Sequence, residues 1–392
     1  SEVFEVIADG GAASTVDISS IVFTNVTTKF TIDDAADKLT SGADAATYLL
    51  PGTSAIDDFT ADTVIAGGTG TDVLDINTTS AVSIASGTVT GMDTLDMVDA
   101  QVGVTMTATQ ANQFSLFKGV GATHEPVVIA ADAGDTAMDV SAATFTNALV
   151  NITIDKAGDN IKLGSGTDTV AIATAFDFTA ATVVNAGTGA DTLDQNSVSA
   201  MDFSLGTLTG FETLLGLDNS GGAADTYTAA QIDQFTTITG PGSGTYAFEV
   251  VDTAGAATTL DIMTNVTQAN GRLIEGYTVD NAADSLKGGK GASTFKIEDT
   301  LTLGASANLT GNDGTDVIDI NTVDVIDLSA ATIATIEQLH LDAAAGPASV
   351  VVSAAQHAAF TYTNDASDTI KIVGADAGNV APTSAIDKIV VG

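Results

Sequence analysis

The chain repeats itself at a long period, and this repetition restricts its fold more than any other feature. Three segments recur in the same order: a Thr-Ile/Val-Asp segment ending in Asp-x-Leu/Ile, a Gly-x-Asp-x-Leu/Ile-Asp segment, and a Ser/Thr-Ala-x-Gln segment closed by Phe. Their copies begin at residues 31, 153 and 278, at residues 70, 189 and 314, and at residues 107, 228 and 353. Successive copies are 119–125 residues apart (189 − 70 = 119; 278 − 153 = 125). Each repeat of roughly 122 residues should therefore form the same local structure.

The register of the copies predicts the domain organisation. We expect complete repeats over residues 1–122, 123–244 and 245–369, and the start of a fourth, partial repeat over residues 370–392, where Ile372-Val-Gly-Ala-Asp-Ala-Gly matches Val128-Ile-Ala-Ala-Asp-Ala-Gly. Such an array either belongs to a longer protein or joins a neighbour end to end. We expect head-to-tail contacts through the apolar segment 370–392.

Within one repeat, most of the sequence has the pattern of short β-strands. Runs rich in Val, Ile, Thr and Leu are separated by Gly, Asn and Asp, as in 62–65, 72–76 and 92–97. The Ser/Thr-Ala-x-Gln segments differ, because a hydroxyl residue precedes Ala and Gln as a helix N-cap, which predicts one short helix in each. The sequence therefore predicts an all-β fold of repetitive β-solenoid or β-roll-like coils with short helices; stacked small β-sandwiches are the alternative.

Charge restricts the partners of the chain. It carries 11 Lys plus Arg against 50 Asp plus Glu, a formal net charge of −39, while 44% of its residues are hydrophobic, enough for a packed core. A polyanion repels phosphate, so we expect no binding to nucleic acid or to an anionic membrane. The sequence has no run of about 18 apolar residues, so we expect no insertion into a membrane. The absence of Cys excludes disulfides, thiol nucleophiles and Cys-based metal sites.

One motif carries chemistry. Residues 67–75, Gly-Gly-Thr-Gly-Thr-Asp-Val-Leu-Asp, fit the nonapeptide G-G-x-G-x-D-x-U-x at each defined position. Partial fits lie at 164–170, 185–193 and 311–318, and the counterpart at 288–295 has Ser293 where Asp is expected. Calcium prefers six to eight oxygen ligands, and glycines let consecutive carbonyls turn toward an ion. The predicted calcium ligands are Gly68, Gly70, Asp72, Gly166, Asp168, Gly187, Gly189, Asp191, Gly311, Asp313, Gly314 and Asp316.

On these residues the sequence resembles the RTX (repeats-in-toxin) family of secreted calcium-binding β-roll proteins, and in particular the β-solenoid surface-layer and adhesin proteins of Gram-negative bacteria. The resemblance implies Ca²⁺ as the cofactor, a bacterial cell-surface location and type I secretion. It also implies that calcium binding is coupled to folding. Asp72 lies in the best-matched motif. The corner at Ser293 lacks the usual carboxylate, so we expect it to be free of an ion or held by main-chain oxygens alone.

Other interpretations of the same residues stay open. The Gly-x-Gly-x-Asp segments also suit simple turns in which Asp accepts a main-chain amide. The recurrent pairs Asp33/Asp37, Asp155/Asp159 and Asp280/Asp284 are either further calcium ligands or solvated turn residues. The acid excess also suits adaptation to high salt.

Function follows from the repetition. Near-equal copies argue against a single active site, and no Ser/His/Asp set or phosphate-binding loop recurs, so we expect no enzyme. We expect a calcium-stabilised structural protein, a building block of a surface layer, filament or adhesin stalk that assembles with copies of itself. The alternative is a carbohydrate-binding or targeting module that binds a cell-surface polysaccharide. An ice- or mineral-binding solenoid is a third interpretation.

Overall fold

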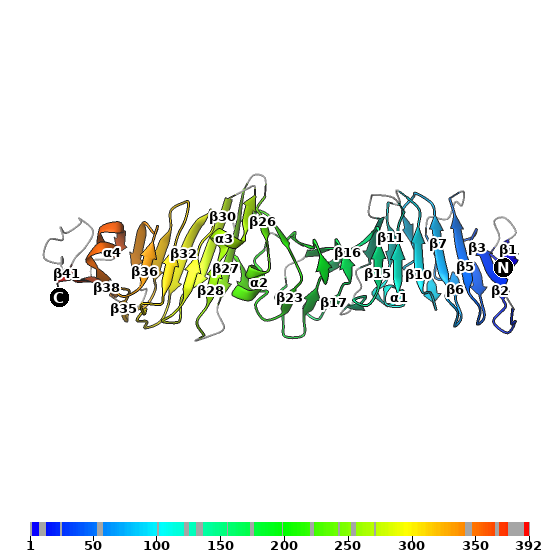
Figure 1. Ribbon diagram of the computed structural model, residues 1–392, viewed down its shortest axis with the longest axis horizontal. Coiled ribbons are helices and arrows are strands. Elements are labelled where there is room, and N and C mark those ends of the chain that lie inside the picture. The colour runs from blue at the N-terminus through cyan, green and yellow to red at the C-terminus, as the bar shows by residue number, and fades with distance from the viewer. Residues whose placement is uncertain are drawn as a thin grey trace. The chain divides into compact units, whose positions relative to one another are not determined.

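A computed structural model of the chain is nearly all β, with strands over 48% of the residues and helices over 6%, and it forms a parallel β-solenoid of about 14 turns (Figure 1). This confirms the predicted fold class and excludes stacked sandwiches. The structure describes the chain except residues 1, 8–12, 24–25, 53–57, 100–101, 121–124, 131–135, 155, 173–175, 198, 220–222, 242–243, 252–255, 270–271, 342–346, 365–367, 375–387 and 392.

The chain divides into two compact units. The first comprises residues 1–194 and 206–211, and the second comprises residues 195–205 and 212–392. The predicted repeat boundaries are a property of the sequence, and they stay a prediction.

In the first unit, the chain moves from sheet to sheet, so each strand pairs in parallel with a strand one coil further on (Figure 1). A seven-stranded sheet consists of β1 (Glu2–Val6), β3 (Val26–Thr31), β5 (Ala46–Pro51), β7 (Val73–Asn77), β10 (Thr94–Met97), β12 (Leu116–Lys118) and β15 (Thr144–Thr146). Facing strands are β2 (Thr15–Asp17), β4 (Lys38–Thr40), β6 (Val64–Ala66) and β9 (Thr88–Thr90), then β14 (Ala137–Asp139), β17 (Asn160–Lys162), β20 (Val183–Asn185) and β23 (Thr207–Thr209). Further strands are β8 (Val82–Ser83), β11 (Val104–Met106), β13 (Glu125–Ile129), β16 (Ala148–Ile154), β19 (Thr169–Ile172) and β22 (Thr192–Gln195), and the short pair β18 (Ser165–Gly166) and β21 (Thr188–Gly189).

The second unit is built in the same way. Its largest sheet is β25 (Asp225–Thr228), β27 (Thr245–Val251), β30 (Arg272–Thr278), β32 (Ala292–Ile297), β34 (Val317–Ile320), β37 (Gln338–Leu341) and β39 (Thr361–Asn364). The others are β24 (Thr213–Gly216), β26 (Thr237–Thr239) and β29 (Thr267–Ala269); β28 (Thr259–Asp261), β31 (Ser285–Lys287), β33 (Asn308–Thr310) and β36 (Thr332–Ala334); and β35 (Val325–Asp327), β38 (Ser349–Ser353), β40 (Thr369–Val373) and β41 (Lys388–Val391).

The core consists of inward columns of side chains from successive coils. Strands alternate buried and half-exposed residues, and the parallel register places equal positions side by side. Phe30 stacks on Tyr48 with ring centroids 4.8 Å apart, and Tyr277 lies against Phe295 at 5.1 Å. Because each ring is buried by its neighbours above and below, the coils stabilise one another and no coil has a core of its own.

Four short helices lie in the described residues: α1 (Ala108–Ala111), α2 (Ala229–Asp233), α3 (Ile262–Asn265) and α4 (Ala354–Ala359). The three predicted helices are confirmed as α1, α2 and α4, each with a complete capping box formed by the hydroxyl residue and the Gln. None of the helices in the described part of the chain has the length and apolar character that crossing a lipid bilayer requires.

Candidate functional site

The four glycine–aspartate segments occupy equivalent corners of the coils. Each joins the end of a short strand to the start of a longer one, as residues 67–72 do between β6 and β7. Every one of these loops ends in an aspartate that is completely buried: Asp72, Asp168, Asp191 and Asp316. The predicted ligand Asp313, in contrast, is exposed. The recurrent aspartate is thus an interior residue of the corner.

At the Asp72 corner, both carboxylate oxygens accept main-chain hydrogen bonds. The Ala46 amide, one coil earlier, donates to Oδ1 at 2.9 Å, and the Gly68 amide of the same loop donates to Oδ2 at 2.9 Å. Burial raises the pKa of the Asp72 carboxyl above its ordinary value, and these two hydrogen bonds oppose the rise. The carboxylate therefore fastens its own loop to the preceding coil.

The Asp316 corner in the second unit has the same arrangement. The Ser293 amide donates to Oδ1 at 2.7 Å, and the Asn312 amide donates to Oδ2 at 3.0 Å. A hydrogen bond also links this corner to the next coil, because the Asp316 amide donates to Glu337 Oε2 at 2.9 Å. Burial raises the pKa of Asp316 as well.

The hydrogen bonds at the corners of Asp168 and Asp191 differ from those at Asp72 and Asp316. The Val150 amide donates to Asp168 Oδ1 and the Asp168 amide donates to Asp191 Oδ1, both at 2.7 Å. Asp168 Oδ2 is buried and has no hydrogen-bond partner. Burial raises the pKa of Asp168 to about 6. A buried carboxylate oxygen without a partner is costly, so this corner has capacity for a cation or a proton.

The glycines of these loops allow close approach between coils. A Cβ on Gly68 would lie 1.4 Å from the carbonyl oxygen of Gly42, and one on Gly189 would lie 1.5 Å from that of Gly166. Positive φ angles are present at Gly187 (92°) and Gly314 (119°). The predicted ligands Gly70 and Gly311 lie in the same loops, and Gly70 is likewise packed against main-chain atoms of the neighbouring coil.

These observations test whether calcium fits the corners. In the part of the chain that the structure describes, no three His, Cys, Asp or Glu side chains form a metal-binding group. At Asp72 and Asp316, each carboxylate oxygen accepts one main-chain amide hydrogen, which uses part of its capacity to bind an ion. At Asp168, Oδ2 has no hydrogen-bond partner, and the position of a Cβ on Gly166 lies 3.3 Å from Oδ1, 3.6 Å from Oδ2 and 3.7 Å from the carbonyl oxygen of Ala148.

The corner at Ser293 contains a carboxylate that the sequence reading missed. Glu275 Oε2, on β30, accepts hydrogen bonds from the Gly289 amide at 2.6 Å, the Ser293 hydroxyl at 3.2 Å and the Tyr277 hydroxyl at 2.7 Å. The corner therefore lacks the usual aspartate but contains another carboxylate, and the absence of an ion there stays a prediction. Glu275 is adjacent to Ser293 only through the strand register, which the motif does not contain.

The recurrent aspartate pairs have a main-chain role at their second member. Asp37 Oδ1 accepts the Ser14 amide at 2.8 Å, and its Oδ2 accepts the Asp33 and Asp34 amides. Asp159 and Asp284 make equivalent bonds to Thr136 and Thr258. Their burial excludes the interpretation as solvated turn residues. Asp155 lies outside the described residues.

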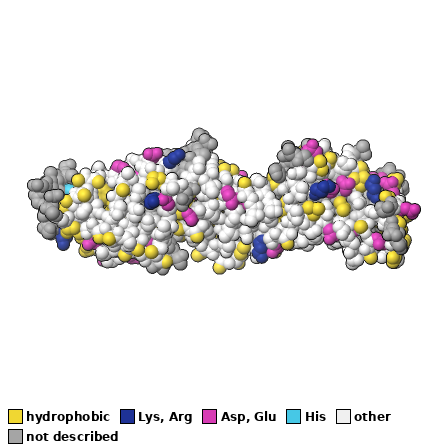
Figure 2. Space-filling model, viewed as in Figure 1, with side chains coloured by type: hydrophobic (Ala, Val, Ile, Leu, Met, Phe, Trp, Pro, Cys, Tyr) yellow, Lys and Arg dark blue, Asp and Glu magenta, His cyan; other side chains and the backbone are white. Residues whose placement is uncertain are grey.

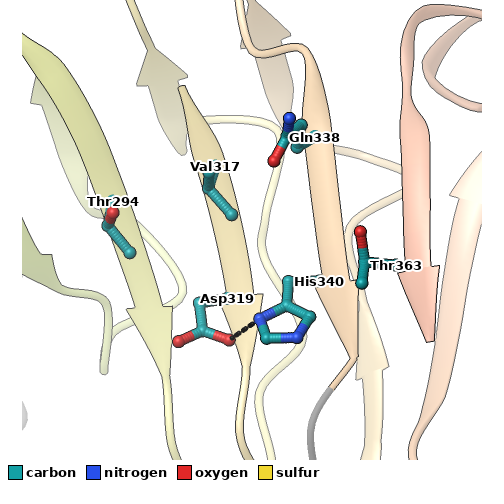
Figure 3. Close-up of a pocket in the computed structure, with 6 residues that line it drawn as sticks. All are labelled: Thr294, Val317, Asp319, Gln338, His340 and Thr363. Carbon is teal, nitrogen blue, oxygen red and sulfur yellow. Dashed lines mark ion pairs between the residues drawn. The ribbon is translucent and has the colours of Figure 1, made fainter. Parts of the chain in front are cut away.

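A depression of about 360 Å³ lies on the outer face of the largest sheet of the second unit (Figure 3). Side chains from four adjacent strands line it: Thr294, Val317, Asp319, Gln338, His340 and Thr363. His340 Nδ1 lies 3.1 Å from Asp319 Oδ1, and the two residues are register partners on β37 and β34. The depression is open, and its lining consists of five polar side chains and Val317.

The outer surface has few paired charges. On the face seen in Figure 2, acidic side chains lie scattered singly. Lysines pair with acids of neighbouring coils, as in Lys118–Asp96 and Lys287–Asp261, both 2.6 Å. Part of the acid excess is internal, because eleven buried carboxylates lie in the described residues: Asp37, Asp72, Glu125, Asp159, Asp168, Asp191, Asp225, Glu275, Asp284, Asp316 and Asp368.

No protein-family model matches this chain, and neither the curated proteins nor the solved structures contain a significant match to it. The solenoid is compatible with an RTX-like repeat protein.

Proposed function

We propose that this protein is an extracellular structural building block of a bacterial surface layer, filament or adhesin stalk that assembles with copies of itself. One observation carries the proposal: the recurrent polar residues of a parallel β-solenoid, Asp37, Asp72 and Gln110 with their copies, are buried and bound to main-chain groups. They maintain the coil stack, so the recurrence of these described residues is accounted for by the fold. Arrays of this kind supply length and repeated surface.

Calcium belongs to this proposal at the Asp168 corner. The support is the buried Asp168 Oδ2 without a hydrogen-bond partner; Oδ2 and the carbonyl oxygen of Ala148 lie 3.6 and 3.7 Å from the position of a Cβ on Gly166. A bound Ca²⁺ would supply the positive charge that this oxygen lacks. The resemblance to RTX proteins supports the same cofactor, and with it secretion through a type I channel to the cell surface.

Self-assembly is tested on the full chain by light scattering and electron microscopy after removal of divalent ions. We expect ordered sheets or filaments when CaCl₂ is added, and none with MgCl₂ at equal ionic strength. A chain that stays monomeric at every calcium and protein concentration would contradict the proposal.

The depression around His340 favours a second candidate function, binding of a polysaccharide. Its amide, imidazole, hydroxyl and carboxylate groups are those that bind sugar hydroxyls, and they project from one flat sheet face (Figure 3). Gel electrophoresis through cell-surface polysaccharide should then show retardation that His340→Ala and Gln338→Ala reduce. Thr278→Ala, three strands away on the same face, is the matched control. Equal migration of all four proteins would exclude this candidate.

A further inference from the structure

We propose that Asp72 and Asp316 are metal-free latches, in which one carboxylate holds the amide of its own loop and the amide of the preceding coil in place of a calcium ion. This inference departs from the sequence motif, and it does not depend on the proposed assembly or on calcium at Asp168.

The first argument is the identity of the atoms around each carboxylate. A calcium ion requires carboxylate and carbonyl oxygens that converge at about 2.3–2.6 Å. The Asp72 carboxylate accepts the N–H groups of Ala46 and Gly68, and the Cβ position of Gly67 lies 2.8 Å from Oδ2, whereas the Asp93 carboxylate interacts with it repulsively from the next coil. Amide hydrogens and an α-carbon carry partial positive charge, so they stabilise the carboxylate and repel a cation.

The second argument is that the same contacts occur in both units. The Cβ position of Gly311 lies 2.3 Å from Asp316 Oδ2, and those of Gly67 and Gly311 each lie 2.1 Å from a carbonyl oxygen of the next coil, Gly91 or Thr335. The first glycine of the motif is therefore required because the carboxylate and the next coil pack directly on its α-carbon. This explains the motif's glycine and aspartate without an ion.

The third argument comes from the corner at which Ser293 stands in the place of the aspartate. Gly289 precedes Ser293 by four residues, as Gly68 precedes Asp72 and Asn312 precedes Asp316. The Gly289 amide still donates to a carboxylate, now that of Glu275, at 2.6 Å. In all three corners, a carboxylate oxygen accepts the amide of the residue four positions before the Asp or Ser. Glu275 Oε2 takes up three donors, including Tyr277 and Ser293, and is itself fully buried.

The fourth argument is that the same chemistry occurs where no glycine motif exists. Asp37 and Asp284 each accept one amide of the preceding coil on Oδ1 and two amides of their own turn on Oδ2. A carboxylate that accepts several main-chain amides is thus the general corner device of this solenoid, and the Asp72 and Asp316 corners are two further instances of it.

The test counts bound calcium by isothermal titration calorimetry of the full chain and measures its melting temperature in chelator. Asp72→Ala and Asp316→Ala should lower the melting temperature by roughly 5–15 °C in chelator and leave the number of bound calcium ions unchanged, because only hydrogen bonds are lost. Asp168→Ala is the matched control and should remove one ion. Loss of one bound ion in Asp72→Ala or Asp316→Ala would overturn the latch.

A measurement on the unsubstituted protein decides the question if a variant does not fold. Hydrogen–deuterium exchange in chelator should leave the amides of peptides covering 67–72 and 311–316 protected, as in calcium. Deprotection of these peptides in chelator alone would overturn the inference. If Asp168→Ala leaves the calcium count unchanged, the calcium proposal fails while the latches remain.

Discussion

Asp225 is a buried carboxyl group near the start of the second unit, and its surroundings make it sensitive to pH. Its Oδ1 accepts the Met201 amide and its Oδ2 accepts the Tyr246 hydroxyl, both at 2.9 Å, while Tyr227 and Tyr246 share a further hydrogen bond. Burial raises the pKa of Asp225 to about 7, and these hydrogen bonds reduce the rise. The groups that face it are the two tyrosines, whose own pKa values are raised well above the ordinary value by the same burial.

The sign of the pH effect follows from this shift. The folded protein keeps the Asp225 proton at pH values where the unfolded chain has lost it, so this residue favours folding fully below about pH 4 and progressively less as the pH rises through about 7. Urea unfolding at pH 4.5, 6 and 7.5 should show a falling free energy of unfolding, on the order of 3–4 kcal/mol from this residue. Asp225→Asn, neutral at every pH, should flatten the dependence. Exposed Asp62→Asn is the control, and a slope unchanged in Asp225→Asn would contradict the assignment.

Among the secondary-structure elements, the short helices α1, α2 and α4 are each held to the coil before them by one glutamine. Gln110 Oε1 accepts the Thr107 amide to complete the capping box, and its Nε2 donates to the carbonyl oxygens of Ile84 and Gly87, both at 2.9 Å. Gln356 makes the equivalent bonds to Leu328 and Ala331. The recurrence of this residue is therefore explained by a contact between coils as well as by the helix cap.

Gln110→Ala should lower the free energy of unfolding by about 1–3 kcal/mol, because two buried carbonyl oxygens lose their donor. Gln110→Glu retains the acceptor for Thr107 but cannot donate, so it should destabilise at least as much as Ala. Thr109→Ala, on the exposed face of α1, should change the stability little. Denaturant unfolding of the three variants measures this, and near-wild-type stability of Gln110→Glu would show that the helix cap alone matters.

Periodicity was sufficient to predict α1, α2 and α4, but it gave no signal for α3, and it could not supply the strand register. The helix and strand types followed from local signals: a hydroxyl N-cap before Ala and Gln, and alternation in runs such as the one that forms β7. Local signals could not predict that Asp72 is buried. They also could not predict that Glu275 supplies the carboxylate at the Ser293 corner, because each feature depends on which residue of the neighbouring coil lies opposite. The sequence located the corners; the hydrogen-bond partners 18–26 residues away determine what their carboxylates do.

At the scale of the whole molecule, charge acts in two separate ways. The net charge is −39, and part of it lies inside the protein. Buried carboxylates such as Asp37 and Asp284 accept hydrogen bonds from main-chain amides, and these bonds stabilise their negative charge. Exposed acids outnumber the lysines available to them, and they repel one another through solvent. Only this second contribution depends on ionic strength.

The stability of the chain should therefore respond to salt and to calcium differently. In chelator, raising NaCl from about 10 mM to about 500 mM shortens the Debye length from about 30 Å to below 10 Å, which screens the exposed acids and should raise the melting temperature. Adding CaCl₂ at matched ionic strength should give a further, saturable increase, and Asp168→Ala should abolish that increase while keeping the response to NaCl. Strand content by circular dichroism should persist in chelator at high salt, because the corners at Asp72 and Asp316 hold their amides without an ion. Complete loss of strand signal in chelator at high salt would mean that the ion, and not the amide latch, holds the coils together.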